Sequence, residues 1–374
     1  MGQMRELPVG VPDGTGTAEA AASLKFLQPV SRQLVHRAAV AEVFITDALP
    51  VGEDRFVVGA QWPRDHALYS PDAQGLSDPL LLTETVRQSL VYLAHEHYGI
   101  PADYRFVGSD THFEITGHEA FLVGDAPLQV TLDVRWSWVA NRPPRRFGMR
   151  VDAVVSVAGR ACARAALRVW AVDEGLYRRL RWRGAQGPDG AEAAPVGHRA
   201  ARTATGAAAP TVPTVPTGAT GATRLPAADV GRLRAKDSVL GRTEAGEWRL
   251  LVDLHHAVLF DHPGDHIPLM VTLEGARQLG HHLVHRHSTA PAGAVLRAVR
   301  MDCPAFANLD EPVRLGVESQ PPAAGSDVTL LRVTAVQREE VVAGVTMEWL
   351  PRVLPAEPEE VAFSRGAVGS VSVA

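Results

Sequence analysis

One helical segment, present twice, constrains the fold of this 374-residue chain more than any other feature. The first copy runs from Pro79 to Gln88 and the second from Pro268 to Gln278, one residue longer, and both contain Glu-x-x-Arg-Gln. Each copy follows a strand-like stretch and a turn-rich loop, and each continues into a histidine-rich end. Such self-similarity predicts that one structural unit is built twice and that the two copies pack together. The usual length of roughly 100 to 200 residues per domain also favours two units.

Strand-like sequence follows each helical segment, because apolar and polar residues alternate there. The ranges are 128–139, 148–158 and 160–172 in the first half, and 313–318, 327–336 and 339–350 in the second. Ala158-Gly159 is a hairpin signal between two of them. Each half therefore predicts strand, loop, long helix and antiparallel strands, which belongs to the α+β class. We expect a tandem hotdog: helices at 79–98 and 268–285 facing one another, wrapped by curved antiparallel sheets that form one continuous sheet.

Composition divides the chain into five parts. Residues 184–227 are rich in Ala, Thr, Pro and Gly and have little to bury, so we expect a mobile linker there. On this division residues 1–30 are an N-terminal extension and 31–183 the first hotdog repeat. The second repeat is expected at 228–356, with a C-terminal tail at 357–374.

The overall composition argues against several kinds of partner. A net charge of -5 with 21% charged residues leaves no basic excess for a nucleic-acid backbone. No apolar run approaches the ~18 residues of a membrane span, and the N-terminus lacks a signal-peptide pattern, so we expect a cytoplasmic protein. Cys162 and Cys303 are too isolated to indicate a disulfide framework or a thiolate zinc site. Lysine is nearly absent beside arginine, which is typical of a GC-rich, actinobacterial genome.

Glu84, Arg87 and Gln88 are the polar residues set into the first helical segment, and their spacing places them on one face. The apolar residues around them point to nearly all sides, which indicates a buried helix. A single Glu-x-x-Arg is often only an exposed salt bridge. Its recurrence in the second repeat favours an active-site cleft instead, because buried carboxylates need partners; the residues there are Glu274, Arg277 and Gln278.

The loop before the second helix carries Asp261-His262-Pro263. A His-Pro turn followed by a helix with a Glu resembles the active-site loop of hotdog dehydratases that act on acyl carrier protein thioesters. In those enzymes the His is the general acid or base, and the Glu comes from the facing hotdog. The same histidines could also suggest a metal site, but their spacing matches no standard zinc signature, so we expect no metal.

Together these features resemble the A-factor biosynthesis hotdog family, over roughly residues 34–182 and 239–351. Its members look like two fused hotdogs with Glu-x-x-Arg-Gln in both and a Phe-Asp-His-Pro-x-Asp-His-x-Pro loop in the second. This chain departs from the pattern at two places. Leu269 stands where many hotdog enzymes have Gly, and in the first repeat Asp65-His66 echoes Asp261-His262 without a following proline.

The resemblance implies an acyltransferase that needs no cofactor. It would move a β-ketoacyl group from acyl carrier protein, or from acyl-CoA, to the hydroxyl of dihydroxyacetone phosphate, towards a butyrolactone, butenolide or furan signal. Acyl transfer needs a base for the hydroxyl and a cation for the phosphate. The candidate catalytic residues are Glu84, His262 and Glu274. The candidate substrate-binding residues are Arg87, Gln88, Arg277, Gln278, Asp261 and His66.

Two other functions remain open on the sequence alone. The same His and Glu could serve a dehydratase or thioesterase acting on acyl thioesters, or the chain could be a non-catalytic, acyl-binding regulatory module. In the dehydratases each site lies between two hotdogs. We therefore expect His262 to face Glu84, and Glu274 to face the loop around His66 and Ser70.

Overall fold

The computed structural model describes residues 14–182, 221–287, 293–320 and 327–351. The first part of the chain contains, in order, α1 (Gly14–Ser23), β1 (Ile45–Gly52), β2 (Arg55–Trp62), α2 (Leu80–Glu96), β3 (Arg105–Ile115), β4 (Leu128–Trp138), β5 (Arg146–Val157), β6 (Arg160–Val172) and α3 (Glu174–Trp182). The second part contains β7 (Ala222–Arg224), β8 (Leu240–Thr243), β9 (Trp248–Leu250), α4 (Leu269–His287), β10 (Ala294–Asp302), β11 (Val313–Gln320), β12 (Thr329–Gln337) and β13 (Glu340–Pro351). Short 3-10 turns lie at Arg32–Val35, Val40–Glu42, His118–Phe121, Ala227–Val230 and Ala235–Asp237.

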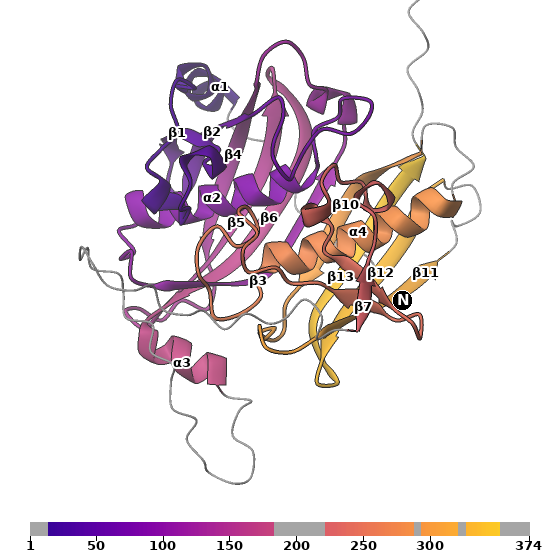
Figure 1. The fold of residues 1–374 in the computed structure, drawn as a ribbon. Helices are drawn as coiled ribbons and strands as arrows, with labels where there is room; N and C mark the ends of the chain where they lie inside the picture. Colours follow the sequence, from indigo (N-terminus) through magenta and orange to yellow (C-terminus); the bar gives the residue numbers. More distant parts are fainter. Residues whose placement is uncertain (1–13, 183–220, 288–292, 321–326, 352–374) are drawn as a thin grey trace, which may run out of the picture.

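All the strands belong to one antiparallel sheet, in the order β1-β2-β4-β5-β6-β3-β10-β13-β12-β11-β9-β8-β7. The two repeats join where β3 pairs with β10, from Ala298 opposite Glu114 to Asp302 opposite Asp110. Figure 1 shows α2 and α4 lying across this sheet. The expected α+β architecture, with two central helices and a continuous antiparallel sheet, is confirmed.

Helix α2 is buried along almost its whole length, as its apolar residues on all sides predict. It ends before Gly99, whose φ of 64° lies in the left-handed region that favours glycine. Helix α4 packs closely against the sheet at Gly275, where a Cβ atom would lie 2.4 Å from Leu250 Cδ1. The two helices begin one residue later than the sequence predicts, at Leu80 and Leu269.

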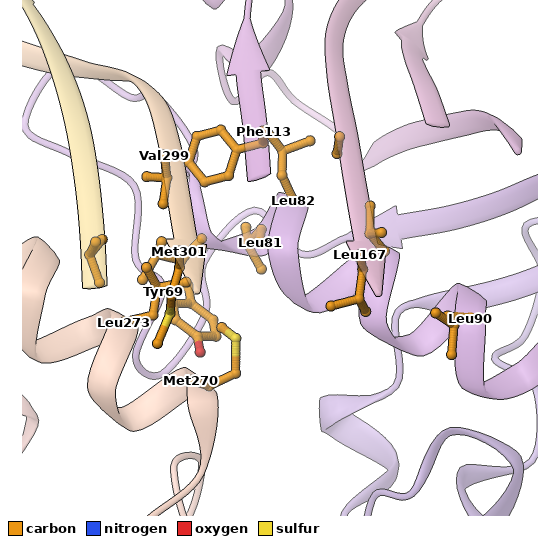
Figure 2. Close-up of a cluster of buried hydrophobic side chains, with 14 of the residues drawn as sticks. Tyr69, Leu81, Leu82, Leu90, Phe113, Leu167, Met270, Leu273, Val299 and Met301 are labelled. Atoms are coloured by element: carbon orange, nitrogen blue, oxygen red, sulfur yellow. The ribbon is translucent and has the colours of Figure 1, made fainter. Parts of the chain in front are cut away.

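The N-terminal ends of the two helices meet in a shared apolar core at the seam (Figure 2). Tyr69, from the loop before α2, lies there beside Met270 and Leu273 of α4. Phe113 on β3 pairs directly with Val299 on β10. Burying each large apolar side chain stabilises the fold by roughly 1.5–3 kcal/mol, so the seam binds the repeats into one folding unit.

The boundaries of the second repeat differ from the prediction. Strand β7 falls inside the expected linker, yet it pairs with β8. Next to it, the Leu225 amide donates to the Leu240 carbonyl at 3.0 Å. The second repeat therefore begins by Ala222 rather than at 228, because a short edge strand can form from few residues. Residues 184–220 of the expected linker and the tail at 357–374 lie outside the described residues.

Two helices extend the first repeat beyond the basic hotdog plan. Helix α1 lies in the expected N-terminal extension and packs against β1 and β2. Helix α3 follows β6 directly and sits beyond one end of the first half of the sheet (Figure 1). Among the described residues, no helix combines the length and the apolar character that crossing a membrane requires.

Candidate active site

Glu84 is the centre of a polar cluster inside the first repeat. Its side chain is 1% exposed and projects from α2. Oε1 accepts hydrogen bonds from Arg37 Nε at 3.0 Å, Arg87 Nη2 at 2.7 Å and Gln88 Nε2 at 2.7 Å, while Oε2 accepts from Arg87 Nε at 2.9 Å. Burial would raise the pKa of Glu84, but the guanidiniums of Arg37 and Arg87 bring it down to about 2. We call these four residues the Glu84 cluster.

Gln88 ties this cluster to the chain segment that precedes β1. Its Oε1 accepts from the Phe44 amide at 2.8 Å, and its Nε2 donates to the Glu42 carbonyl at 2.7 Å as well as to Glu84. Gln278 makes the matching contacts in the second repeat, with the Val239 amide at 2.8 Å and the Asp237 carbonyl at 2.7 Å. The recurring Gln is therefore a structural anchor in both repeats, which accounts for its buried position.

The loop of the second repeat reaches across to the Glu84 cluster. The Asp261 carboxylate accepts from the amides of Ala38 at 2.6 Å and Ala39 at 3.1 Å, and its side chain is 2% exposed. The Val258 carbonyl, in the same loop, accepts from Arg37 Nη1 at 3.4 Å. These contacts hold the loop that carries His262 against the first repeat, as a site shared by both repeats requires.

His262 is the titratable group that this loop brings to the Glu84 cluster. Its side chain is 58% exposed, and its Nδ1 lies 3.9 Å from Asp261 Oδ2. Partial burial lowers the pKa of His262, and the nearby cations Arg37 and Arg87 lower it further. His262 is therefore a neutral, solvent-accessible imidazole beside two guanidiniums at neutral pH.

Arg87 is the member of the cluster best placed to meet a ligand. Its side chain is 24% exposed, against 8% for Arg37. Nε and Nη2 bind Glu84, and Nη2 also donates to the Val35 carbonyl at 3.1 Å. Within the described ranges, Nη1 of Arg87 has no hydrogen-bond partner. A guanidinium held on one edge and open on the other is suited to an anion.

A histidine pair lies beside Arg87. His95 Nδ1 contacts the Ile100 carbonyl at 2.6 Å, so it carries the proton, and its Nε2 then accepts from His36 Nε2 at 2.8 Å. Burial lowers the pKa of His36 to about 3, and the neighbouring His95 and Arg87 act in the same direction. The His36 ring is therefore neutral at neutral pH.

Glu274 is the centre of the corresponding cluster in the second repeat, with a different set of bonds. Arg232 binds it bidentately, from Nε at 2.7 Å and from Nη2 at 2.5 Å, and Gln278 Nε2 donates to it at 2.5 Å. Arg232 also donates from Nη1 to the Asp78 carboxylate, at 2.5 Å. The side chains of Arg232 and Glu274 are both 0% exposed. We call Glu274, Arg232, Gln278 and Asp78 the Glu274 cluster.

Arg277 stands at the edge of the Glu274 cluster and does not hold Glu274 as Arg87 holds Glu84. Its Nη1 donates to the carbonyls of Val230 at 2.8 Å and Gly231 at 3.2 Å, and its Nη2 lies 3.4 Å from Asp78. Burial lowers the pKa of Arg277, and the neighbouring Arg232 lowers it further. Within the described residues, the two predicted site residues Glu274 and Arg277 form no hydrogen bond with each other.

The expectation that His66 is the counterpart of His262 is wrong. His66 Nδ1 accepts from the amides of Leu68 at 3.2 Å and Tyr69 at 3.0 Å, and its Nε2 lies 3.3 Å from Glu42. His256 makes the same contacts in the second repeat, with Nε2 at 3.1 Å from Asp237. Each imidazole thus holds a buried turn, and the loop around His66 and Ser70 offers no second catalytic histidine. Asp78, rather than His66, is what this loop supplies to the Glu274 cluster.

Comparisons with known proteins agree with a two-repeat chain. The model of the A-factor biosynthesis hotdog domain matches residues 18–173 and again residues 217–352. The chain belongs to this A-factor family. A relative from Streptomyces virginiae, named 2-oxo-3-(phosphooxy)propyl 3-oxoalkanoate synthase, is 35% identical over 84% of this chain and 95% of its own length. A relative of the same name from Streptomyces griseus is 31% identical over 86% of this chain and 95% of its own length.

Solved structures are more distant from this member of the A-factor family. The 12:0-ACP thioesterase from Umbellularia californica is 10% identical, with a TM-score of 0.41, and the match covers 79% of this chain and 94% of that chain. The two hotdogs of this chain follow from the family match and from the order of the strands in the sheet.

Sequence reasoning missed three charged residues of the Glu84 and Glu274 clusters: Arg37, Arg232 and Asp78. A signal for the two arginines was present, because Val-x-Arg followed five residues later by an acid occurs at Val35 and again at Val230. For Asp78 there was none, since its counterpart in the second repeat is Pro268. Within the described part of the chain, His, Cys, Asp and Glu side chains form no group of three that could hold a metal.

Proposed function

We propose that this chain transfers a 3-oxoacyl group from a thioester carrier to the free hydroxyl of dihydroxyacetone phosphate, forming 2-oxo-3-(phosphooxy)propyl 3-oxoalkanoate. The names of the relatives support this activity. The observation in the structure that carries it is the open edge of Arg87 in the cluster that the His262 loop contacts, since a phosphorylated acceptor needs a cation close to the base that activates its hydroxyl.

His262 is the proposed general base. As a neutral imidazole it takes the proton of the acceptor hydroxyl while the oxygen attacks the thioester carbonyl. The tetrahedral intermediate then collapses, the carbon–sulfur bond breaks, and the thiolate leaves with the proton returned by His262. This sequence is balanced without an oxidant, a metal or a cofactor.

Glu84 has a positioning role in this proposal rather than a proton-transfer role. A carboxyl with a pKa of about 2 that already accepts from Arg37, Arg87 and Gln88 is a weak base. Its charge fixes the two guanidiniums. Arg87 is left with Nη1 for the phosphate, and Asp261 keeps the His262 loop in place.

Product analysis tests the activity directly. Purified protein is incubated with a 3-oxoacyl thioester and dihydroxyacetone phosphate, and the products are identified by mass spectrometry. The ester of the two substrates is expected, with release of one equivalent of thiol. Free 3-oxo acid formed at the same rate with and without the acceptor would instead identify a thioesterase. Dehydration of a 3-hydroxyacyl thioester without ester formation would identify a dehydratase.

A further inference from the structure

Arginines concentrate at one end of the first half of the sheet. Arg105 begins β3, Arg146 begins β5, and both pair with Val172 at the end of β6. Helix α3 starts two residues after Val172 and adds further arginines. We call the set the arginine patch: Arg105, Arg142, Arg145, Arg146, Arg178 and Arg179.

Backbone contacts hold these arginines on one surface. The Asp173 amide, just before α3, donates to the Arg145 carbonyl at 3.1 Å, and Arg142 pairs with Arg146 across the loop that leads into β5. The Tyr104 hydroxyl donates to the Pro144 carbonyl at 2.6 Å, which joins the start of β3 to the same loop. The patch is therefore built from three segments with defined positions.

The patch is only partly neutralised by carboxylates. Glu174 pairs with both Arg105, at 3.3 Å, and Arg178, at 3.0 Å. Arg142, Arg145 and Arg179 are exposed and form no ion pair within the described segments. In a chain with a net charge of -5, such a local excess of cations is a feature of this surface and not of the whole protein.

Helix α3 also connects the patch to the proposed active site. The Tyr177 hydroxyl donates to Asp265 Oδ1 at 2.6 Å, and Arg181 Nη2 donates to the Asp265 carbonyl at 2.8 Å. Asp265 is three residues beyond His262, so at most ~11 Å of extended chain separates them. A partner bound at the patch would lie beside the loop that carries the proposed base.

We propose that the arginine patch docks the acidic surface of an acyl carrier protein and so presents its thioester to the His262 loop. This inference rests on the proposed function, which requires an acyl donor, and it names the donor as protein-borne. Unpaired guanidiniums attract a carboxylate-rich surface, speed the encounter and fix its orientation, and the attraction weakens with salt. A free acyl thioester has no such surface and gains nothing from the patch.

The test compares two donors of the same acyl chain. One is a 3-oxoacyl acyl carrier protein, and the other is the 3-oxoacyl thioester of N-acetylcysteamine. The variant R142E/R145E/R179E reverses the three unpaired charges. The matched control R135E/R164E/R332E reverses three exposed arginines on β4, β6 and β12 that likewise form no ion pair in the described chain.

The patch variant should lower kcat/KM for the carrier-borne donor by ~10-fold or more, as loss of electrostatic steering does, and leave kcat/KM for the small thioester unchanged. The control should change neither. Fluorescence anisotropy of labelled carrier protein gives a second measurement that does not depend on turnover, and wild-type binding should weaken with added NaCl and be lost in the patch variant.

Several results would overturn the docking surface. Equal losses with both donors, equal losses in the control variant, or undiminished carrier binding by the patch variant would each do so, as would tighter binding of a DNA duplex than of the carrier. If wild-type protein forms ester with neither donor, the proposed function fails, and the anisotropy measurement still decides whether the patch binds the carrier.

Discussion

The Glu84 and Glu274 clusters grow from the same repeated motif, yet only the first keeps a cation available to a ligand. In the Glu84 cluster, Arg87 is 24% exposed and has a free Nη1 within the described structure. In the Glu274 cluster, Arg232 is fully buried and every nitrogen of its guanidinium is bonded to Glu274 or Asp78. The motif alone therefore does not make a site, because the surrounding loops determine whether the arginines of a cluster are fully paired with internal carboxylates.

The position of one additional carboxylate explains much of this difference. Asp78 precedes α2, accepts from the Leu80 amide at 2.8 Å, and directs its other oxygen to Arg232. Asp261 comes from the opposite loop and binds two backbone amides instead, with Arg37 Nη1 only at 3.9 Å. In the first arrangement two carboxylates share one buried arginine, and in the second Glu84 is the carboxylate that both Arg37 and Arg87 bind.

The histidine pairs His36/His95 of the first repeat and His281/His285 of the second repeat also differ in how they are packed. His36 stands where the second repeat has Gly231, and there the ring of His281 fills the space, since a Cβ on Gly231 would lie 2.7 Å from His281 Cε1. His281 and His285 stack with ring centroids 3.8 Å apart. The second repeat thus packs its imidazoles on each other from one helix, whereas the first places His36 on a separate segment beside Arg87.

The largest expected effect is on the free energy of unfolding and comes from the Glu274 cluster. Arg232→Met leaves Glu274 and Asp78 buried without their shared cation, so the free energy of unfolding should fall by roughly 3–5 kcal/mol. Arg87→Met should cost clearly less, because Glu84 keeps Arg37 and Gln88. Urea denaturation followed by tryptophan fluorescence measures both. Equal losses would show that the two clusters carry the same structural weight.

The next effect is on kcat and concerns the Glu84 cluster and the His262 loop. His262→Ala should lower kcat by ~10²-fold or more, the usual contribution of one acid-base group, and Glu84→Gln should do likewise by releasing Arg37 and Arg87. Glu274→Gln should do less at a temperature where circular dichroism shows it folded. His255→Ala, in the same loop but exposed, is the control. A dead Glu274→Gln beside an active Glu84→Gln would reverse the assignment of the two clusters.

The architecture could be predicted from the sequence because the helical segment with Glu-x-x-Arg-Gln occurs twice. An apolar helix that contains charged residues needs a surrounding sheet to bury it, so two such helices predict two sheet-covered units. The strands at the seam were missed, since β3 mixes Gly108, Ser109, Asp110 and His112 with its apolar residues and shows no clean alternation. Its polar side chains have partners in the sheet, such as Arg168 on Asp110, and such partners cannot be read from one strand alone.

The candidate site was predictable only in part, for a related reason. The residues of the motif were found, and the pairing of repeat two's loop with Glu84 was implied by the resemblance to hotdog dehydratases, whose sites lie between two hotdogs. Arg37 and Arg232 are far from the motif in sequence, and their role depends on a left-handed turn at His36 and Gly231 that directs them inward. His66 was misassigned because Asp-His in a loop looks alike whether the imidazole holds a turn or meets a substrate.

A smaller effect concerns substrate affinity and separates the two arginines of the motif. Arg87→Lys should raise the KM for dihydroxyacetone phosphate by ~10-fold, because lysine cannot bind Glu84 through one edge and a phosphate through another. Arg277→Lys should leave this KM within about twofold, since Arg277 donates to backbone carbonyls and lies beside Asp78. Initial rates over a range of acceptor concentrations decide it. A raised KM in Arg277→Lys alone would move the phosphate to the second repeat.

The smallest effect is a shift in the pH dependence of kcat/KM, and it tests whether the charges of the Glu84 cluster change the pKa of His262. Its pKa lies below the ordinary 6.5, first through burial and then through Arg37 and Arg87, while Asp261 acts in the opposite direction. The base must be neutral, so kcat/KM should rise with pH through this pKa. Arg87→Gln removes a cation that disfavours the imidazolium, which raises the pKa and moves the acidic limb to higher pH. Asp261→Asn removes an anion that favours the imidazolium and should move the limb to lower pH. Solvent screening at a half-exposed ring keeps each shift below ~1 pH unit. The pH profiles of the three proteins measure the two displacements, and a limb that stays in place in both variants would mean that the titrating base is not His262.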